Sequence, residues 1–299
     1  MLNDHLFSPL NKKSKRSKEA FFSSYHRSYK FKLTPFGWGG LLFLSLLLLG
    51  SWLAPIFCKH NYYETVLSLK NQPPSSLFLF GTDELGRDIF ARIWAGARIS
   101  LFVGLTASFI DLIIGVFYGA ISGFKGGKLD QFMMRSIDIL NSIPYLLVVI
   151  LLIVVVGPGL LSIILALSLT GWVNMARMVR AQVLQIKEKE YVKVALANKA
   201  SFYWILMKHV IPNILPSIIV TLTLSIPSAI FAEAFLSFLG LGVQAPMASW
   251  GTMAHDGLSA LRYYPWRLFF PASFISITML CFNLIGDALR DALETRNQI

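Results

Sequence analysis

Six apolar runs divide the chain, each close to the roughly 20 residues with which a helix crosses the hydrocarbon core of a membrane. Polar segments rich in Lys, Arg, Gly and Pro separate them. We therefore expect an all-α, polytopic membrane protein with six transmembrane helices. The predicted spans are Phe36–Phe57, Ile99–Ile121, Ile139–Val156, Leu160–Met175, Ile214–Leu239 and Leu268–Ala288.

The spacing of the runs predicts an appended first helix followed by one compact five-helix unit. From Ile99 onward the apolar runs follow one another with short connections, whereas a long polar stretch separates them from the first run. The predicted organisation is a basic N-terminal tail (1–35), an anchor helix (36–57), an external loop with a short helix (58–98), a five-helix core (99–292) containing a basic loop (181–213), and a C-terminal tail (293–299). Thr82 or Asp83 is the expected cap of the short external helix.

Composition supports a membrane protein over a soluble one. The chain has 299 residues, of which 55% are hydrophobic and 14% charged. Its five histidines are scattered without metal-ligand spacing, and it contains no phosphate-binding glycine loop of the Walker type. Two cysteines, Cys58 and Cys281, imply no disulfide framework. We therefore expect a non-catalytic chain without a metal or a cofactor of its own.

The distribution of Lys and Arg predicts the orientation, because cytoplasmic flanks carry the excess. With six spans and a cytoplasmic N-terminus, twenty of the twenty-seven Lys and Arg fall on the cytoplasmic side. We thus expect both termini in the cytoplasm. The basic tract 11–32 is interpreted as an orientation determinant in preference to a nucleic-acid or lipid-binding segment.

The loop between the fourth and fifth runs is the most informative segment. Residues 177–213 contain seven Lys or Arg and two acids. Helix is predicted from Ile186 to Asn198 and again from Ala200 to Lys208, ending before Pro212. Such a helical hairpin can place Tyr191, Val194, Ala195 and Asn198 in a partner's groove. The alternative interpretation is a solvated connector.

Two acids lie inside predicted spans, where a charge is costly unless it faces a cavity or a partner. Asp111 belongs to the second span and Glu233 to the fifth. Each is a candidate for the translocation path, or alternatively a hydrogen-bonded group within the bundle. Ser225 and Ser228 flank Pro227, which is expected to bend the fifth span and make it line a cavity.

Several motifs in a fixed order resemble one family of permeases. The basic loop carries Glu190–Ala195 and His209–Asn213, which resemble the cytoplasmic coupling loop of permease subunits in bacterial ABC-type importers. Within that group, the chain is similar to the C-type permease subunits of oligopeptide and dipeptide importers. The motifs that carry this resemblance are Gly81–Asp88, Met134–Pro144, Ser237–Gly242, Ser249–Gly251 and Phe282–Leu293.

The resemblance implies the type I ABC importer permease fold, a location in the bacterial plasma membrane and transport by alternating access. It also implies partners: a homologous second permease, two cytosolic ATPase subunits that bind ATP and Mg²⁺, and an external solute-binding protein that delivers peptide. The ATPase-coupling residues would be Glu190, Tyr191, Val194, Ala195, Asn198, Lys199, His209, Pro212 and Asn213. We expect Ala195→Asp to abolish transport in a subunit that still folds.

The coupling loop departs from the family pattern at two places. Lys193-Val194-Ala195 stands where the family has Glu-Ala-Ala, and Lys199 stands where it has a glycine at the turn. Asn198 is expected to take the left-handed turn geometry instead. The same scaffold also imports nickel complexes, glutathione or antimicrobial peptides. An ion-coupled secondary transporter is the alternative from a different class.

Overall fold

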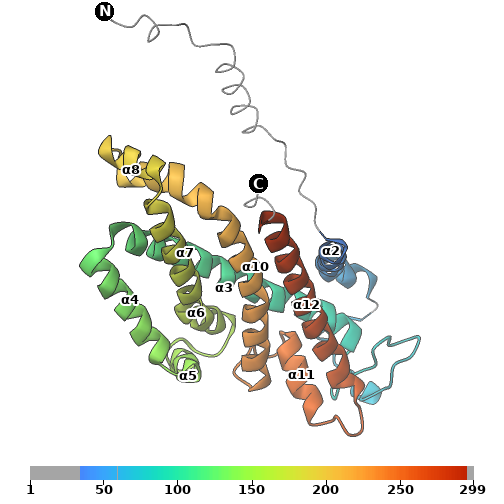
Figure 1. Cartoon of the computed structure of the whole chain (residues 1–299). Coiled ribbons are helices and arrows are strands. Elements are labelled where there is room, and N and C mark those ends of the chain that lie inside the picture. The colour runs from blue at the N-terminus through green and yellow to red at the C-terminus, as the bar shows by residue number, and fades with distance from the viewer. Residues whose placement is uncertain (1–33, 59, 295–299) are drawn as a thin grey trace, which may run out of the picture. The chain divides into compact units, whose positions relative to one another are not determined.

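The computed structural model describes residues 34–58 and 60–294, and these residues fold almost entirely into helices (Figure 1). The predicted tails 1–35 and 293–299 lie outside the described residues except at positions 34–35 and 293–294. The helices are α2 (Pro35–Phe57), η2 (Leu67–Leu69), α3 (Ile89–Lys125), α4 (Gly127–Ser142), α5 (Tyr145–Val156), α6 (Leu160–Thr170), α7 (Trp172–Lys187), α8 (Glu190–Ala197), α9 (Phe202–Ile205), η3 (Leu206–Val210), α10 (Ile211–Phe238), α11 (Trp250–Leu258) and α12 (Trp266–Glu294).

Five helical segments among the described residues are long and apolar enough to cross a membrane, and a bent pair could supply a sixth. This confirms the predicted all-α, polytopic class. The five are Pro35–Ala54, Ile89–Lys125, Leu160–Lys187, Phe202–Phe238 and Trp266–Leu293.

The third predicted span is not one straight helix. The chain turns by 82° between α4 and α5. Pro144 has no backbone N–H to donate and forces Ile143 into extended geometry (φ −77°, ψ 128°), so a helix cannot continue through this point. The predicted run Ile139–Val156 therefore divides between the end of α4 and the whole of α5.

The second span begins ten residues earlier than its apolar run suggests. Asp88 caps α3 by accepting a hydrogen bond from the Phe90 N–H (3.0 Å), and the helix then runs from Ile89 to Lys125. Asp83 instead binds the Arg87 side chain, with 2.6 Å between Nε and Oδ2, inside the preceding loop. The expected cap at Thr82 or Asp83 is thus wrong, and residues 89–98 belong to α3 rather than to a separate short helix.

Helices α3 and α7 pack at close range along a row of glycines. Gly115, Gly119 and Gly123 recur every four residues on α3 and face α7. A side chain at Gly119 would collide with the carbonyl oxygen of Ala176. Small residues at this spacing allow helix backbones to approach closely in a membrane. The row holds α7, and with it the basic loop, against the longest helix of the bundle.

Figure 1 shows α3 running across the bundle past α7, α10 and α12. The basic loop, with α8, lies at one end of these helices, and α11 lies at the other end. The loop is therefore well separated from the α11 end.

Candidate coupling hairpin and membrane cavity

The basic loop folds into two short helices joined by a tight turn, here called the hairpin (residues 190–210). It consists of α8, a turn over 198–201, α9 and the π-helical η3. The Ser201 hydroxyl caps α9 by accepting from the Trp204 N–H at 3.3 Å. The predicted pair of helices is confirmed, although the first is shorter than expected because α7 ends at Lys187 and a new helix starts at Glu190.

The turn of the hairpin differs from the prediction in which residue takes the left-handed conformation. Lys199 has φ +56°, whereas Asn198 has φ −77°. A lysine in this conformation costs more than a glycine, because its Cβ lies close to the following carbonyl. Lys199 therefore occupies the turn geometry for which the family uses glycine.

Pro212 does not end the hairpin either. It lies near the start of α10, directly after the π-helical turn η3 and inside the helical segment Phe202–Phe238, and the helix continues to Phe238. The neighbouring Asn213 donates its side-chain N–H to the His209 carbonyl at 2.5 Å. The hairpin is therefore continuous with the fifth span, and Phe202–Phe238 forms one helical segment.

One face of α8 is buried in the protein's own core. Val192 and Ala195 belong to a buried cluster with Val183 of α7 and Ile214 of α10. Ala195 is only 9% exposed. The expectation that Ala195 enters a partner's groove is thus wrong, since its side chain already packs within this chain.

The neighbouring face of α8 is apolar and exposed. Val194 is 59% exposed, and Tyr191, one turn earlier, is exposed as well. The Tyr191 ring lies 5.8 Å from that of His209, which lies 4.9 Å from the Trp204 ring. These four residues form a continuous surface, the exposed apolar face of the hairpin, that can contact another protein.

Charged side chains border this face. Lys193 pairs with Glu188 at 2.9 Å, and both are exposed. Hydrogen bonding to the Lys193 ammonium lowers the pKa of Glu188 below its usual range. Glu188 is thus ionised at neutral pH. Glu190, Asn198 and Lys199 are also exposed on the hairpin.

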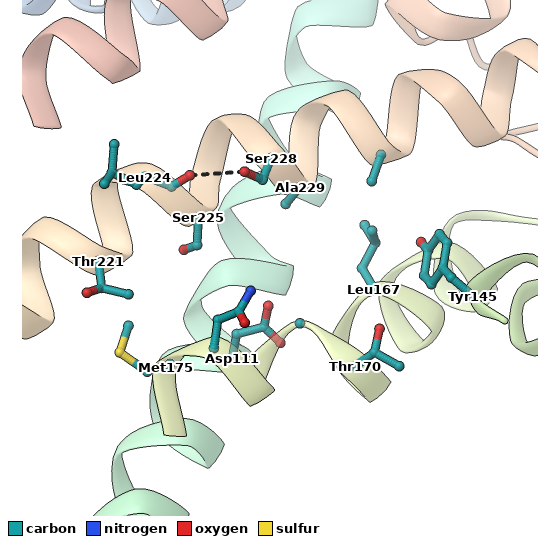
Figure 2. Close-up of a pocket in the computed structure, with 13 residues that line it drawn as sticks. Asp111, Tyr145, Leu167, Thr170, Met175, Thr221, Leu224, Ser225, Ser228 and Ala229 are labelled. Carbon is teal, nitrogen blue, oxygen red and sulfur yellow. Dashed lines mark hydrogen bonds between the residues drawn. The ribbon is translucent and has the colours of Figure 1, made fainter. Parts of the chain in front are cut away.

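A cavity of about 420 Å³ lies between α3, α7 and α10 (Figure 2). It brings together three of the four residues predicted for the translocation path, Asp111, Ser225 and Ser228. The remaining polar side chains of its lining are Tyr145, Thr170, Asn174 and Thr221. α10 continues through Pro227 as one helix, and Ser225 and Ser228 on either side of this proline line the cavity.

Glu233 lies elsewhere. It is fully buried and accepts hydrogen bonds from the Ser100 hydroxyl (2.9 Å) and the Ser237 hydroxyl (2.8 Å). Ser100 also accepts from the Trp250 N–H at 3.3 Å, so the carboxyl joins α3, α10 and α11. The sequence left Glu233 as either a path residue or a hydrogen-bonded group within the bundle. Its contacts match the second interpretation, and Glu233 is not among the described residues that line the cavity.

The sequence pattern could have indicated more of the cavity. Thr221, Ser225 and Ser228 share one face of α10 at helical spacing. Asn174 is a polar residue in an otherwise apolar run. By contrast, no pattern placed Tyr145 or Thr170 in the lining, since their positions depend on the turns at Pro144 and Gly171. Within residues 34–58 and 60–294, no three His, Cys, Asp or Glu side chains are grouped to hold a metal ion.

Comparisons with known proteins identify the family. Residues 115–299 match the family described as binding-protein-dependent transport system inner membrane component. The chain belongs to this family. The permease is 57% identical over 257 residues to the oligopeptide transport system permease protein OppC of Bacillus subtilis, covering 86% of this chain and 84% of the relative. It is 55% identical over 258 residues to the dipeptide transport system permease protein DppC of the same organism, covering 86% and 81%.

A solved structure confirms the fold of this permease. An inward-facing structure of the MetNI methionine ABC transporter superimposes with a TM-score of 0.56 at 19% identity, covering 66% of this chain and 94% of that chain. The permease therefore has the fold of ABC importer permeases and is a multi-pass membrane protein. The resemblance drawn from the motifs is confirmed.

Proposed function

We propose that the permease forms part of the path by which an ATP-driven importer moves oligopeptides or dipeptides across the bacterial plasma membrane. Relatives at 57% and 55% identity are named for oligopeptide and dipeptide transport. The cavity, with its hydroxyl, amide and carboxyl side chains, provides polar surface among membrane helices, as a path for zwitterionic solutes requires.

One observation carries the proposal: the hairpin connects two helices that line the cavity. Asn174 lies on α7, and Ser225 lies on α10, the helices that lead into and out of the hairpin. A force applied to the hairpin is thus transmitted to both walls. Rigid-body motion of packed helices is a common way to convert a distant contact into a change of access.

In this proposal the partners are other ABC components. Two cytosolic ATPase subunits bind ATP and Mg²⁺, and one of them receives the exposed apolar face of the hairpin. A homologous second permease completes the path, and an external solute-binding protein delivers the peptide. The permease itself holds no nucleotide and catalyses no reaction.

The hairpin is proposed to lie in the cytoplasm, together with both termini. The excess of Lys and Arg in residues 177–213 supports this orientation. A variant without Cys58 and Cys281 can carry a single new cysteine, either at Lys199 in the hairpin or at Tyr263 beyond α11, both exposed. A membrane-impermeant maleimide should label the cysteine at 263 in intact cells and the one at 199 only after lysis. The reverse pattern would contradict the orientation.

Peptide import is tested by ATP-dependent uptake into proteoliposomes that contain the complete complex. Radiolabelled di-, tri- and pentapeptides, reduced glutathione and a nickel chelate are each offered with the binding protein. Uptake of peptides that requires ATP and the binding protein would support the proposal. Uptake of only glutathione or nickel would change the cargo, and uptake by the permease alone under an ion gradient would contradict an ATP-driven mechanism.

A further inference from the structure

The cavity between α3, α7 and α10 is lined by an acid without a basic partner. Asp111 is the only acidic residue among the described residues of the lining, and no Lys, Arg or His lines the cavity with it. Its side chain is 6% exposed, at a depth where an unpaired carboxylate is costly. A cation from outside this set of residues must balance it when it is ionised.

The two carboxylate oxygens of Asp111 have different surroundings. Oδ2 lies against Gly171, at the break between α6 and α7, where any side chain would collide with it. Oδ1 is buried and has no hydrogen-bond partner among the described residues. Figure 2 shows the carboxylate of Asp111 between the α6–α7 break and the α10 residues Ser225 and Thr221.

The hydroxyls on the α10 wall are committed as donors to their own helix. Thr221 donates to the Ser217 carbonyl (2.9 Å), Ser225 to the Leu222 carbonyl (2.9 Å) and Ser228 to the Leu224 carbonyl (3.2 Å). Each hydroxyl oxygen keeps lone pairs that can accept a hydrogen bond. The wall opposite Asp111 therefore presents acceptors, like Asp111 itself.

Asp111 and the row of acceptors on α10 match a group that donates hydrogen bonds, while Asn174, Tyr145 and Thr170 supply the donors of the lining. A primary ammonium has three N–H donors and a positive charge. We propose that Asp111 and the hydroxyls of α10 bind the N-terminal ammonium of a peptide as it crosses the membrane. This inference rests on the proposed function and assigns Asp111 as a residue that determines which peptides pass. Without such a counter-ion, the ammonium would cross a region of low dielectric unpaired.

The test compares trialanine with N-acetyltrialanine, which has the same length but no ammonium. Uptake is measured in proteoliposomes containing the complete complex, with the binding protein loaded well above its separately measured dissociation constant for each peptide. The ratio of the two rates is taken for the wild type and for Asp111→Asn. Any preference of the binding protein is common to both and cancels when the two ratios are compared.

We expect Asp111→Asn to lower the trialanine to N-acetyltrialanine ratio about tenfold, the effect of one charge-assisted hydrogen bond on a rate. Asp111→Glu, which keeps the carboxylate, should retain most of the wild-type ratio. If Asp111→Asn prevents assembly of the complex, the double variant Ser225→Ala, Ser228→Ala tests the acceptor wall with Asp111 intact, and its ratio should fall about threefold.

Three results would overturn the inference. The first is a ratio in Asp111→Asn equal to that of the wild type. The second is an equal loss of both rates, which would indicate that Asp111 pairs with a basic side chain of the second permease or carries a proton. The third is an unchanged ratio in the serine double variant. Absence of any peptide uptake by the wild type would instead contradict the proposed function, so the two failures are distinguishable.

Discussion

Val194 and Ala195 are adjacent on α8, but the first side chain is exposed and the second is buried. Ala195 is buried among side chains of α7 and α10, while Val194 points away from that cluster. The sequence predicts that both lie on one apolar face, because they fall at roughly helical spacing with Tyr191 and Asn198. It does not reveal which side of that face this chain covers itself, since this depends on how α7 and α10 pack beside the hairpin.

A change at Ala195 should therefore affect folding. Ala195→Asp would bury an unpaired carboxylate, and we expect the free energy of unfolding to fall by more than about 3 kcal/mol. Thermal unfolding in detergent and the amount of protein in the membrane measure this effect. Val194→Asp is the matched control and should unfold like the wild type. Equal unfolding temperatures for Ala195→Asp and the wild type would contradict the burial of Ala195.

At the scale of helices, the glycine row of α3 determines how closely α7 approaches. We expect Gly119→Ala to force the two backbones apart and to cost about 1–3 kcal/mol, as overpacking does in other cores. Gly39→Ala in α2 is the control, because nothing lies within 4 Å of the position its Cβ would occupy. The control should be at least as stable as the wild type, because alanine favours a helix over glycine by up to about 1 kcal/mol. Equal unfolding midpoints for the two variants would show that the close approach is unimportant.

Helix α11 carries a group whose ionisation opposes folding. Burial raises the pKa of Asp256 above its usual range, and the Arg92 guanidinium, with Nη2 3.9 Å from Oδ2, counteracts part of the rise. Folding thus favours the protonated form of Asp256. The stability that this form contributes is present below the pKa of Asp256 in the unfolded protein, about 3.9, and is lost as the pH rises through its pKa in the folded protein.

Asp256→Asn should remove this pH dependence. Relative to the variant, the wild type should lose stability as the pH rises above about 3.9, the ordinary pKa of an aspartate. Thermal unfolding in detergent at each pH measures this loss. Glu84, Arg87 and His255 also act on Asp256 and stay unchanged in the variant. A constant difference between the two proteins as the pH rises would contradict a raised pKa.

The helices themselves were largely predictable from the sequence, and prolines account for most of the differences. Pro144 interrupts an apolar run because it lies where a helix would need its N–H, whereas Pro212 and Pro227 lie within α10. Composition alone does not separate these cases. Pro212 follows directly on the π-helical turn η3, and a proline inside a membrane helix is tolerated when neighbouring groups satisfy the freed carbonyl.

For the whole molecule, the continuity from hairpin to cavity is the feature that connects structure to transport. The helix-forming and helix-breaking residues of the basic loop predicted the hairpin, and the polar residues inside the predicted spans singled out Asp111, Ser225 and Ser228 as candidates for the path. The same reasoning placed Glu233 with them, although its carboxyl joins α3 and α10 through Ser100 and Ser237. An acid in an apolar run has the same signature in both roles, and only its neighbours in space distinguish them.

Transmission of force through the exposed apolar face of the hairpin is tested most directly by ATP hydrolysis. Complete complexes in proteoliposomes are compared with and without peptide-loaded binding protein, for the wild type, Val194→Asp and Leu196→Asp. Leu196 is 40% exposed and lies on the opposite side of α8 from Val194, so it controls for adding a carboxylate to the hairpin. Assembly is checked by copurification of the second permease.

We predict that Val194→Asp loses about nine-tenths or more of the stimulation by the binding protein, because a carboxylate enters an apolar contact with the ATPase. Leu196→Asp should keep most of it. Full stimulation of Val194→Asp, or equal losses in both variants, would show that this face of the hairpin does not couple the ATPase to the membrane helices.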